Sequence, residues 1–203
     1  MKQQILIIGG GTSFDNYDDY ISYLKKDREI SIDKIKIRKT WKNTMDVKLG
    51  EDFEVFLPEM PNTLNARYFE WKIWFERVLT LLGDDLIFIG HSLGGIFLAK
   101  YLSENIIDKK IKTVILVAAP FNDTDSVESL VDFKLPDSFS NLSKQCENIY
   151  LIQSKDDPVV PFEQVEKYKK ELPSAKIMAF EDRGHFSQET FPEIIELIKQ
   201  IAK

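Results

Sequence analysis

A chain of 203 residues, 43% hydrophobic and 30% charged, has the size and composition of one globular domain, so we expect a single domain over residues 1–203. The net charge of −6 argues against nucleic acid as the main partner, because binding to phosphates requires a basic surface. The only cysteine, Cys146, cannot form an internal disulfide, and with two histidines no structural zinc site is expected.

Short apolar runs recur along the chain, each followed by turn residues and then by a helical pattern. The first run is far too short for a signal sequence or a membrane span, so we expect no stable membrane insertion and a cytoplasmic location. Most runs lack polar alternation, which is typical of parallel strands buried on both faces. The predicted strands are Ile5–Ile8, Phe53–Leu57, Leu86–Ile89, Val114–Val117, Ile149–Ile152 and Ile177–Phe180.

Segments with apolar residues at helical spacing separate these strands. The alternation predicts a three-layer α/β fold, with a mostly parallel sheet of about six strands and helices on both faces. Ligands of such sheets bind at the carboxyl ends of the strands. The predicted helices are Tyr17–Lys26, Ala66–Leu82, Leu93–Glu104, Phe162–Glu171 and Pro192–Ala202, with a short helix near Ser126–Phe133 in the loop-rich connection 119–147.

The stretch from Lys34 to Lys48 is basic, with six Lys or Arg residues against Asp46 and with Trp41 in its middle. A contact surface for an anionic substrate, lipid or RNA is one interpretation. A solvated surface excursion is the simpler one, and we assign no function to the stretch.

A nucleophile motif follows the third predicted strand, which runs into Gly90-His-Ser-Leu-Gly-Gly95 and then into a helical pattern. This is G-x-S-x-G between a strand and a helix, the context in which the pattern indicates a nucleophile. Glycines on either side of Ser92 allow strand and helix to pack closely around a strained turn, so that the hydroxyl projects above the sheet. A glycine-rich turn that only packs is the alternative, and we expect Ser92 to be a nucleophile.

A serine hydroxyl needs a base within hydrogen-bond reach to act as a nucleophile at neutral pH. His91 lies within the turn and, by strand alternation, points away from Ser92. His185 follows the last predicted strand and therefore lies at a carboxyl strand end. His185 is the candidate general base.

A carboxylate must then fix the tautomer of the imidazole and stabilise its charged form. The fifth predicted strand is followed by two aspartates that compete for this role, Asp156 and Asp157. We favour Asp157, because Pro158 restricts the backbone of the residue before it to an extended geometry.

Acyl transfer also needs hydrogen-bond donors for the developing oxyanion. One expected donor is the backbone N–H of Leu93, and the other is expected from the glycines after the first strand, Gly11 first and Gly10 second. Four aromatic residues near strand ends are candidates for lining an acyl pocket, although such side chains commonly belong to the core. They are Phe14, Phe121, Phe162 and Phe186.

Four segments together resemble those of the small, capless α/β-hydrolases of the YdeN and retinoblastoma-binding serine hydrolase group. The resemblance covers most of the chain from Ile5 onward and implies the α/β-hydrolase fold. The segments are Leu57-Pro-Glu-Met-Pro-Asn62, Gly90-His-Ser-Leu-Gly-Gly95, Asp156-Asp-Pro-Val-Val-Pro161 and Gly184-His-Phe186.

By this resemblance Ser92 matches the nucleophile, Asp157 the acid and His185 the base, in the chain order of that fold. The chain departs from many relatives where Gly9-Gly10 stands in place of a His-Gly pair, which leaves the second oxyanion donor open.

The expected activity is that of a carboxylesterase-like serine hydrolase, which cleaves small or medium-chain esters through an acyl-enzyme and needs no metal or organic cofactor. The connection 119–147 is too short for a full cap domain and suggests an open site. Thioester or amide hydrolysis are variants. The alternatives are a partner-binding module with little turnover, which the segment around Trp41 would support, and a cofactor-free perhydrolase or lyase on the same scaffold.

Overall fold

One parallel sheet forms the centre of the molecule. The computed structural model describes residues 2–28, 30–124 and 129–203, and in these residues six strands pair in the order β2-β1-β3-β4-β5-β6. The strands are β1 (Gln3–Ile8), β2 (Phe53–Phe56), β3 (Leu86–His91), β4 (Ile111–Val117), β5 (Cys146–Ser154) and β6 (Lys176–Phe180). The predicted α/β fold is confirmed.

The apolar runs account for the positions of all six strands. Every residue of β3 is buried, as expected for a central strand that is covered on both faces. β4 and β5 begin earlier than predicted, because polar residues such as Thr113 and Asn148 also pair in the ladder and do not register as an apolar run.

Among the helices, α5 begins and ends where predicted, whereas Tyr17–Lys26 divides into an α-helix and a π-helical turn. α2, α3 and α6 were not predicted, because they are too short to produce a periodic pattern. Of the predicted short helix, residues 126–128 lie outside the described residues, and its end forms a 3₁₀ turn. The helices are α1 (Tyr17–Ser22), the π-helix η1 (Tyr23–Asp27), α2 (Ile32–Ile35), α3 (Met45–Leu49), α4 (Tyr68–Leu79), α5 (Leu93–Glu104), the 3₁₀ helix η2 (Val131–Phe133), α6 (Ser140–Gln145), α7 (Glu163–Glu171) and α8 (Pro192–Ile201).

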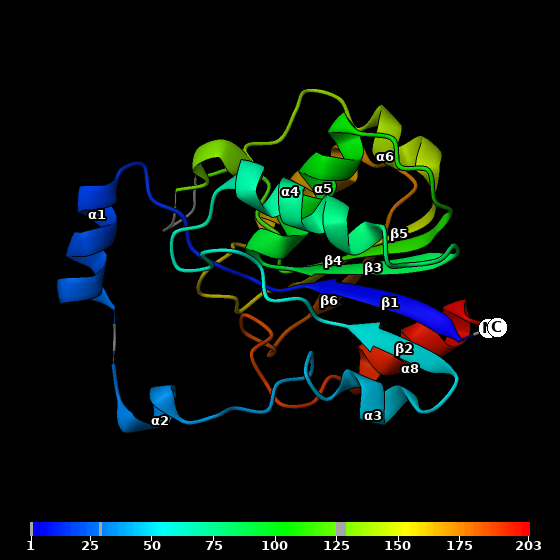
Figure 1. Cartoon of the computed structure of the whole chain (residues 1–203), viewed down its shortest axis with the longest axis horizontal. Helices are drawn as coiled ribbons and strands as arrows, with labels where there is room; N and C mark the ends of the chain where they lie inside the picture. Colours follow the sequence, from blue (N-terminus) through cyan, green and yellow to red (C-terminus); the bar gives the residue numbers. More distant parts are fainter. Residues whose placement is uncertain (1, 29, 125–128) are drawn as a thin grey trace.

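Helices cover both faces of the sheet. α4, α5 and α6 lie over one face, and α3 and α8 lie over the other (Figure 1). The side chains of β1 alternate between two cores: Leu6 joins the larger core with Trp71, and Ile5 joins the smaller one with Trp41. The molecule therefore has the three layers that the sequence predicts.

The segment between β1 and α3 leaves the body of the molecule. It carries α1 and α2 and extends beyond the carboxyl ends of the strands (Figure 1). Every residue from 30 to 39 is exposed, as a solvated excursion requires. Trp41 corrects that interpretation, because its side chain is only 2% exposed and its ring packs edge-on against Phe191, with the ring centroids 5.6 Å apart.

Candidate active site

Ser92 occupies a sharp bend between β3 and α5. Its φ of 55° and ψ of −125° are unusual for a residue with a side chain, and such strain is found mainly where the surrounding structure enforces it. Gly90 and Gly94 make the bend possible. A Cβ atom at Gly90 would lie 2.5 Å from Gly94 O, and one at Gly94 would lie 2.3 Å from Ile8 O, so no other residue fits without movement of the backbone.

Asp157 and His185 are hydrogen-bonded to each other at the carboxyl ends of β5 and β6. His185 Nδ1 lies 2.9 Å from Asp157 Oδ2 and 3.1 Å from Oδ1. A carboxylate only accepts, so Nδ1 carries the hydrogen and Nε2 is left free to accept a proton. The Asp157 side chain is fully buried and that of His185 is 19% exposed. Of the two side chains, only the imidazole can therefore be reached from solvent.

The carboxylate of Asp157 is fixed by its neighbours in the chain. Its Oδ1 accepts from the backbone N–H groups of Val159, at 2.9 Å, and Val160, at 3.0 Å. Gln153 Nε2 donates to Oδ2 over 3.2 Å. These three hydrogen bonds hold the carboxylate in place beside the imidazole.

Asp156, the other candidate for the acid, forms hydrogen bonds with other groups than the imidazole. Its Oδ1 accepts from Gly184 N–H at 2.8 Å and from Ser154 Oγ at 2.5 Å, and these hydrogen bonds, with that of Ser154 contributing most, lower the pKa of the Asp156 carboxyl. Asp156 thus supports the loop before His185, whereas Asp157 contacts the imidazole itself.

The described residues contain no hydrogen bond between Ser92 Oγ and His185. The ring of His91, the residue before Ser92 in the chain, lies 5.0 Å from the ring of His185, so the bend and the His185 loop lie at the same edge of the sheet. Catalytic hydrogen bonds are often long before a substrate binds and tighten only in the complex.

The glycines after β1 lie beside the serine. A Cβ atom at Gly10 would lie 3.1 Å from Ser92 Cβ and 3.6 Å from Ser92 Oγ. One at Gly11 would meet Thr63 O at 2.7 Å and Leu93 Cδ2 at 3.4 Å. Gly10, the second choice from the sequence, therefore borders the hydroxyl directly. Leu93 begins α5, so its N–H has no partner within the helix.

One of the four aromatic residues predicted to line an acyl pocket lies in the core. Phe186 is fully buried between Phe180 and Phe191, at ring distances of 5.8 and 5.2 Å, so it belongs to the smaller core and lines no pocket. Its side chain turns inward because its backbone adopts a φ of 49°. The other three aromatic residues are half-buried and stay candidates: Phe14, Phe121 and Phe162.

A cavity of about 300 Å³ opens next to Gly10. The sequence singles out Gly10 as a candidate oxyanion donor and residues 57–62 by their resemblance to relatives, but it does not predict that they line a pocket. The cavity is lined by Gly9, Gly10, Leu57, Pro58, Glu59, Met60 and Thr63.

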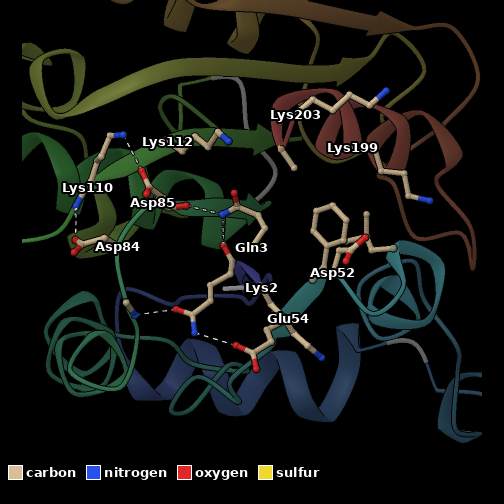
Figure 2. A pocket seen from close by; sticks show the side chains of 15 residues that line it. Lys2, Gln3, Asp52, Glu54, Asp84, Asp85, Lys110, Lys112, Lys199 and Lys203 are labelled. Carbon is tan, nitrogen blue, oxygen red and sulfur yellow. Dashed lines mark hydrogen bonds and ion pairs between the residues drawn. The ribbon is translucent and has the colours of Figure 1, made fainter.

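A second cavity, of about 1490 Å³, lies at the opposite edge of the sheet, around the starts of the strands. Figure 2 shows that charged side chains line it, among them Lys110, which pairs with Asp85 over 2.8 Å. Ser92 lies at the other end of the strands, so this cavity is not part of the candidate active site.

Three residues near the triad candidates were not assigned to the site from the sequence. Trp41 Nε1–H donates to Phe186 O over 2.8 Å, and Lys42 Nζ lies 3.3 Å from His91 Nδ1. Burial lowers the pKa of Lys42 to about 8. These contacts join positions far apart in the chain, so local patterns do not reveal them.

Neither a metal nor a membrane segment is indicated by the described residues. In the part of the chain that the structure describes, no three His, Cys, Asp or Glu side chains are grouped as ligands for a metal ion. Within the same three ranges, no helix has both the length and the apolar character that crossing a bilayer requires.

Comparison with known proteins assigns the chain to a family. The model of the family described as Serine hydrolase matches residues 37–200, which include Ser92, Asp157 and His185. The chain belongs to this serine hydrolase family. Over 151 residues this serine hydrolase is 28% identical to Serine hydrolase RBBP9 of Rattus norvegicus, covering 73% of this chain and 78% of the relative.

Solved structures show the same fold. The ydeN gene product of B. subtilis superposes on this serine hydrolase with a TM-score of 0.71 at 18% identity, covering 99% of each chain. Arabidopsis thaliana SOBER1 gives a TM-score of 0.60 at 15% identity and covers 100% of each chain. The resemblance to the YdeN and retinoblastoma-binding group is confirmed.

Proposed function

We propose that this serine hydrolase cleaves small or medium-chain carboxylic esters, with Ser92 as nucleophile, His185 as general base and Asp157 as the residue that orients the base. The observation that carries the proposal is the strained bend at Ser92, on the same edge of the sheet as the Asp157–His185 pair. The geometry of such a triad, rather than its sequence positions, defines its roles.

The reaction has two steps. Ser92 Oγ attacks the ester carbonyl carbon while His185 Nε2 takes the hydroxyl proton, and the tetrahedral intermediate collapses as the alcohol leaves with that proton. Water then attacks the acyl-enzyme by the same route and releases the carboxylic acid and free Ser92. Leu93 N–H and an N–H of Gly10 or Gly11 are the proposed donors to the oxyanion.

The cavity beside Gly10 supports a substrate of limited size. Its volume of about 300 Å³ is at the lower end of the range for small-molecule sites. The side chains of Leu57 and Met60 form an apolar part of the cavity wall, which suits a short acyl chain. Glu59, an exposed acid in the same lining, disfavours a chain that ends in a carboxylate.

The test is a panel of p-nitrophenyl esters from acetate to palmitate, with matched thioesters, assayed with the wild-type chain and Ser92→Ala. We expect kcat/KM to peak at short or medium chains and Ser92→Ala to lose turnover while melting at the wild-type temperature. Equal turnover in Ser92→Ala contradicts the proposal. Labelling of Ser92 by a fluorophosphonate with no turnover on the panel favours a binding module, and turnover that requires peroxide favours a perhydrolase.

A further inference from the structure

The loop that carries His185 is held by residues from two distant parts of the chain. Trp41 Nε1–H donates to Phe186 O over 2.8 Å. Lys42, the next residue, contacts His91, with Nζ 3.3 Å from Nδ1. The other ring nitrogen of His91, Nε2, lies 2.9 Å from the backbone oxygen of His185. A chain of contacts thus runs from Lys42 through His91 to the backbone of the proposed base.

These contacts define the tautomer of His91. A carbonyl oxygen only accepts, so Nε2 carries the hydrogen that bonds to His185 O. Burial lowers the pKa of His91 well below its usual value, and Lys42 lowers it further, so the ring is neutral and Nδ1 has no hydrogen. Lys42 Nζ donates to that nitrogen. Without this donor, the tautomer with hydrogen on Nδ1 would turn a lone pair toward His185 O.

The backbone around His185 needs support from outside the loop. Gly184 has a φ of 50° and Phe186 a φ of 49°, and the second value is strained for an aromatic residue. On one side Asp156 accepts from Gly184 N–H, and on the other His91 donates to His185 O. Loss of either contact lets the peptide of His185 relax toward less strained angles.

We propose that Lys42 and His91 are positioning residues for hydrolysis: Lys42 selects the tautomer of His91, and His91 Nε2–H holds the peptide of His185 so that its imidazole stays in the orientation that serves Ser92. The inference rests on the proposed function. Neither residue contacts the substrate in this role, and the expected effect is on kcat.

A double-mutant cycle separates this role from a contribution to folding. Lys42→Met, His91→Gln and the double variant are compared by kcat and KM on p-nitrophenyl butyrate. A glutamine at position 91 brings an amide donor close to the position of Nε2 and has no tautomer to select. Lys39→Met is the matched control, since it removes an exposed lysine from the same connection.

We expect Lys42→Met to lower kcat about tenfold and to leave KM within about twofold, because only the orientation of the base changes. In the His91→Gln background the same substitution is expected to change kcat by less than about twofold. Lys39→Met keeps the wild-type kcat. A second measurement needs no variant: the ¹⁵N shifts of His91 in the wild-type chain are expected to show a protonated Nε2 and a bare Nδ1.

Three results overturn the inference: equal losses from Lys42→Met in both backgrounds, an unchanged kcat in Lys42→Met, or hydrogen on Nδ1 of His91 in the NMR spectrum. Ser92→Ala in the same assay keeps the two proposals apart. Turnover that survives in Ser92→Ala contradicts the proposed function itself. An inactive Ser92→Ala together with a wild-type kcat in Lys42→Met overturns only the positioning role.

Discussion

Asp157 and His185 meet in a bond of 2.9 Å between Oδ2 and Nδ1, and this is the contact that distinguishes two adjacent aspartates. Asp157 reaches the imidazole from inside the protein, where its side chain has no exposed surface. Asp156 lies outside and binds the N–H of Gly184. Because the two are adjacent in the chain but only Asp157 contacts the imidazole, their amide variants form a matched pair.

Asp157→Asn is expected to lower kcat by about three orders of magnitude or more, because an amide can present its own N–H to Nδ1 and favour the wrong tautomer of His185. The measurement is kcat on a short-chain p-nitrophenyl ester. Asp156→Asn keeps the Asp157–His185 bond and is expected to lose less than about tenfold. Similar losses in the two variants would contradict the assignment of Asp157.

Gly10→Ala is expected to lower kcat/KM at least about tenfold, because its Cβ would lie 3.1 Å from Ser92 Cβ, at the approach to the hydroxyl. Gly83→Ala is the control, since Gly83 lies at the other end of the strands and a Cβ there would meet only Gln4 Oε1, at an ordinary contact distance of 3.5 Å. For both variants we measure kcat/KM on a short-chain p-nitrophenyl ester and the rate at which a fluorophosphonate labels Ser92. If the two label at equal rates, the glycine loop does not border the reacting atoms.

How far the sequence predicts this site depends on how local each determinant is. The bend at Ser92 is largely local: Gly90 is required by its contacts with Gly94 and Gly95 at the start of the next helix, so the motif reveals the bend, although Gly94 itself is required by the end of the first strand. The choice of Asp157 over Asp156 depends partly on Pro158, a neighbour in sequence. The alternation of apolar runs and helical patterns predicts the parallel sheet with helices on both faces, but not the order in which the strands pair.

The determinants that the sequence does not reveal are long-range or conformational. Trp41 lies in a basic run typical of the surface, yet it is buried by contacts with Phe186 and Phe191, about 150 residues away in the chain. Phe186 was predicted to line a pocket, but its positive φ turns the side chain into the core. No periodicity reports the backbone angle of a single loop residue.

Trp41→Phe is expected to lower the free energy of unfolding by about 2 to 3 kcal/mol, because the oxygen of Phe186 loses its donor and the smaller ring leaves a gap in the core. Urea unfolding followed by circular dichroism measures the change. Trp74→Phe, at a side chain that is 36% exposed, is the comparison and is expected to cost less than about 0.5 kcal/mol. Equal costs would mean that the Trp41 contacts contribute no special stability.

The pH dependence of stability tests the burial of Lys42. Its pKa is lowered from 10.5 to about 8, so between these values the unfolded chain binds the proton more tightly than the folded chain does. The free energy of unfolding therefore rises with pH across this window, by at most about 1.4 kcal/mol per pH unit. Below the window, Lys42 is protonated in both states and does not change the stability. Lys42→Met lacks the effect. Urea unfolding of both proteins from about pH 7 to pH 10 measures it, and parallel curves would contradict it.

The central claim, that Ser92 carries the acyl group, is tested most directly by mass spectrometry of the protein quenched within milliseconds of mixing with a short-chain p-nitrophenyl ester. We expect an added acyl mass on the peptide that contains Ser92 in the wild-type protein, and none in Ser92→Ala. Acyl mass on another residue, or turnover by Ser92→Ala at the wild-type rate, would contradict it.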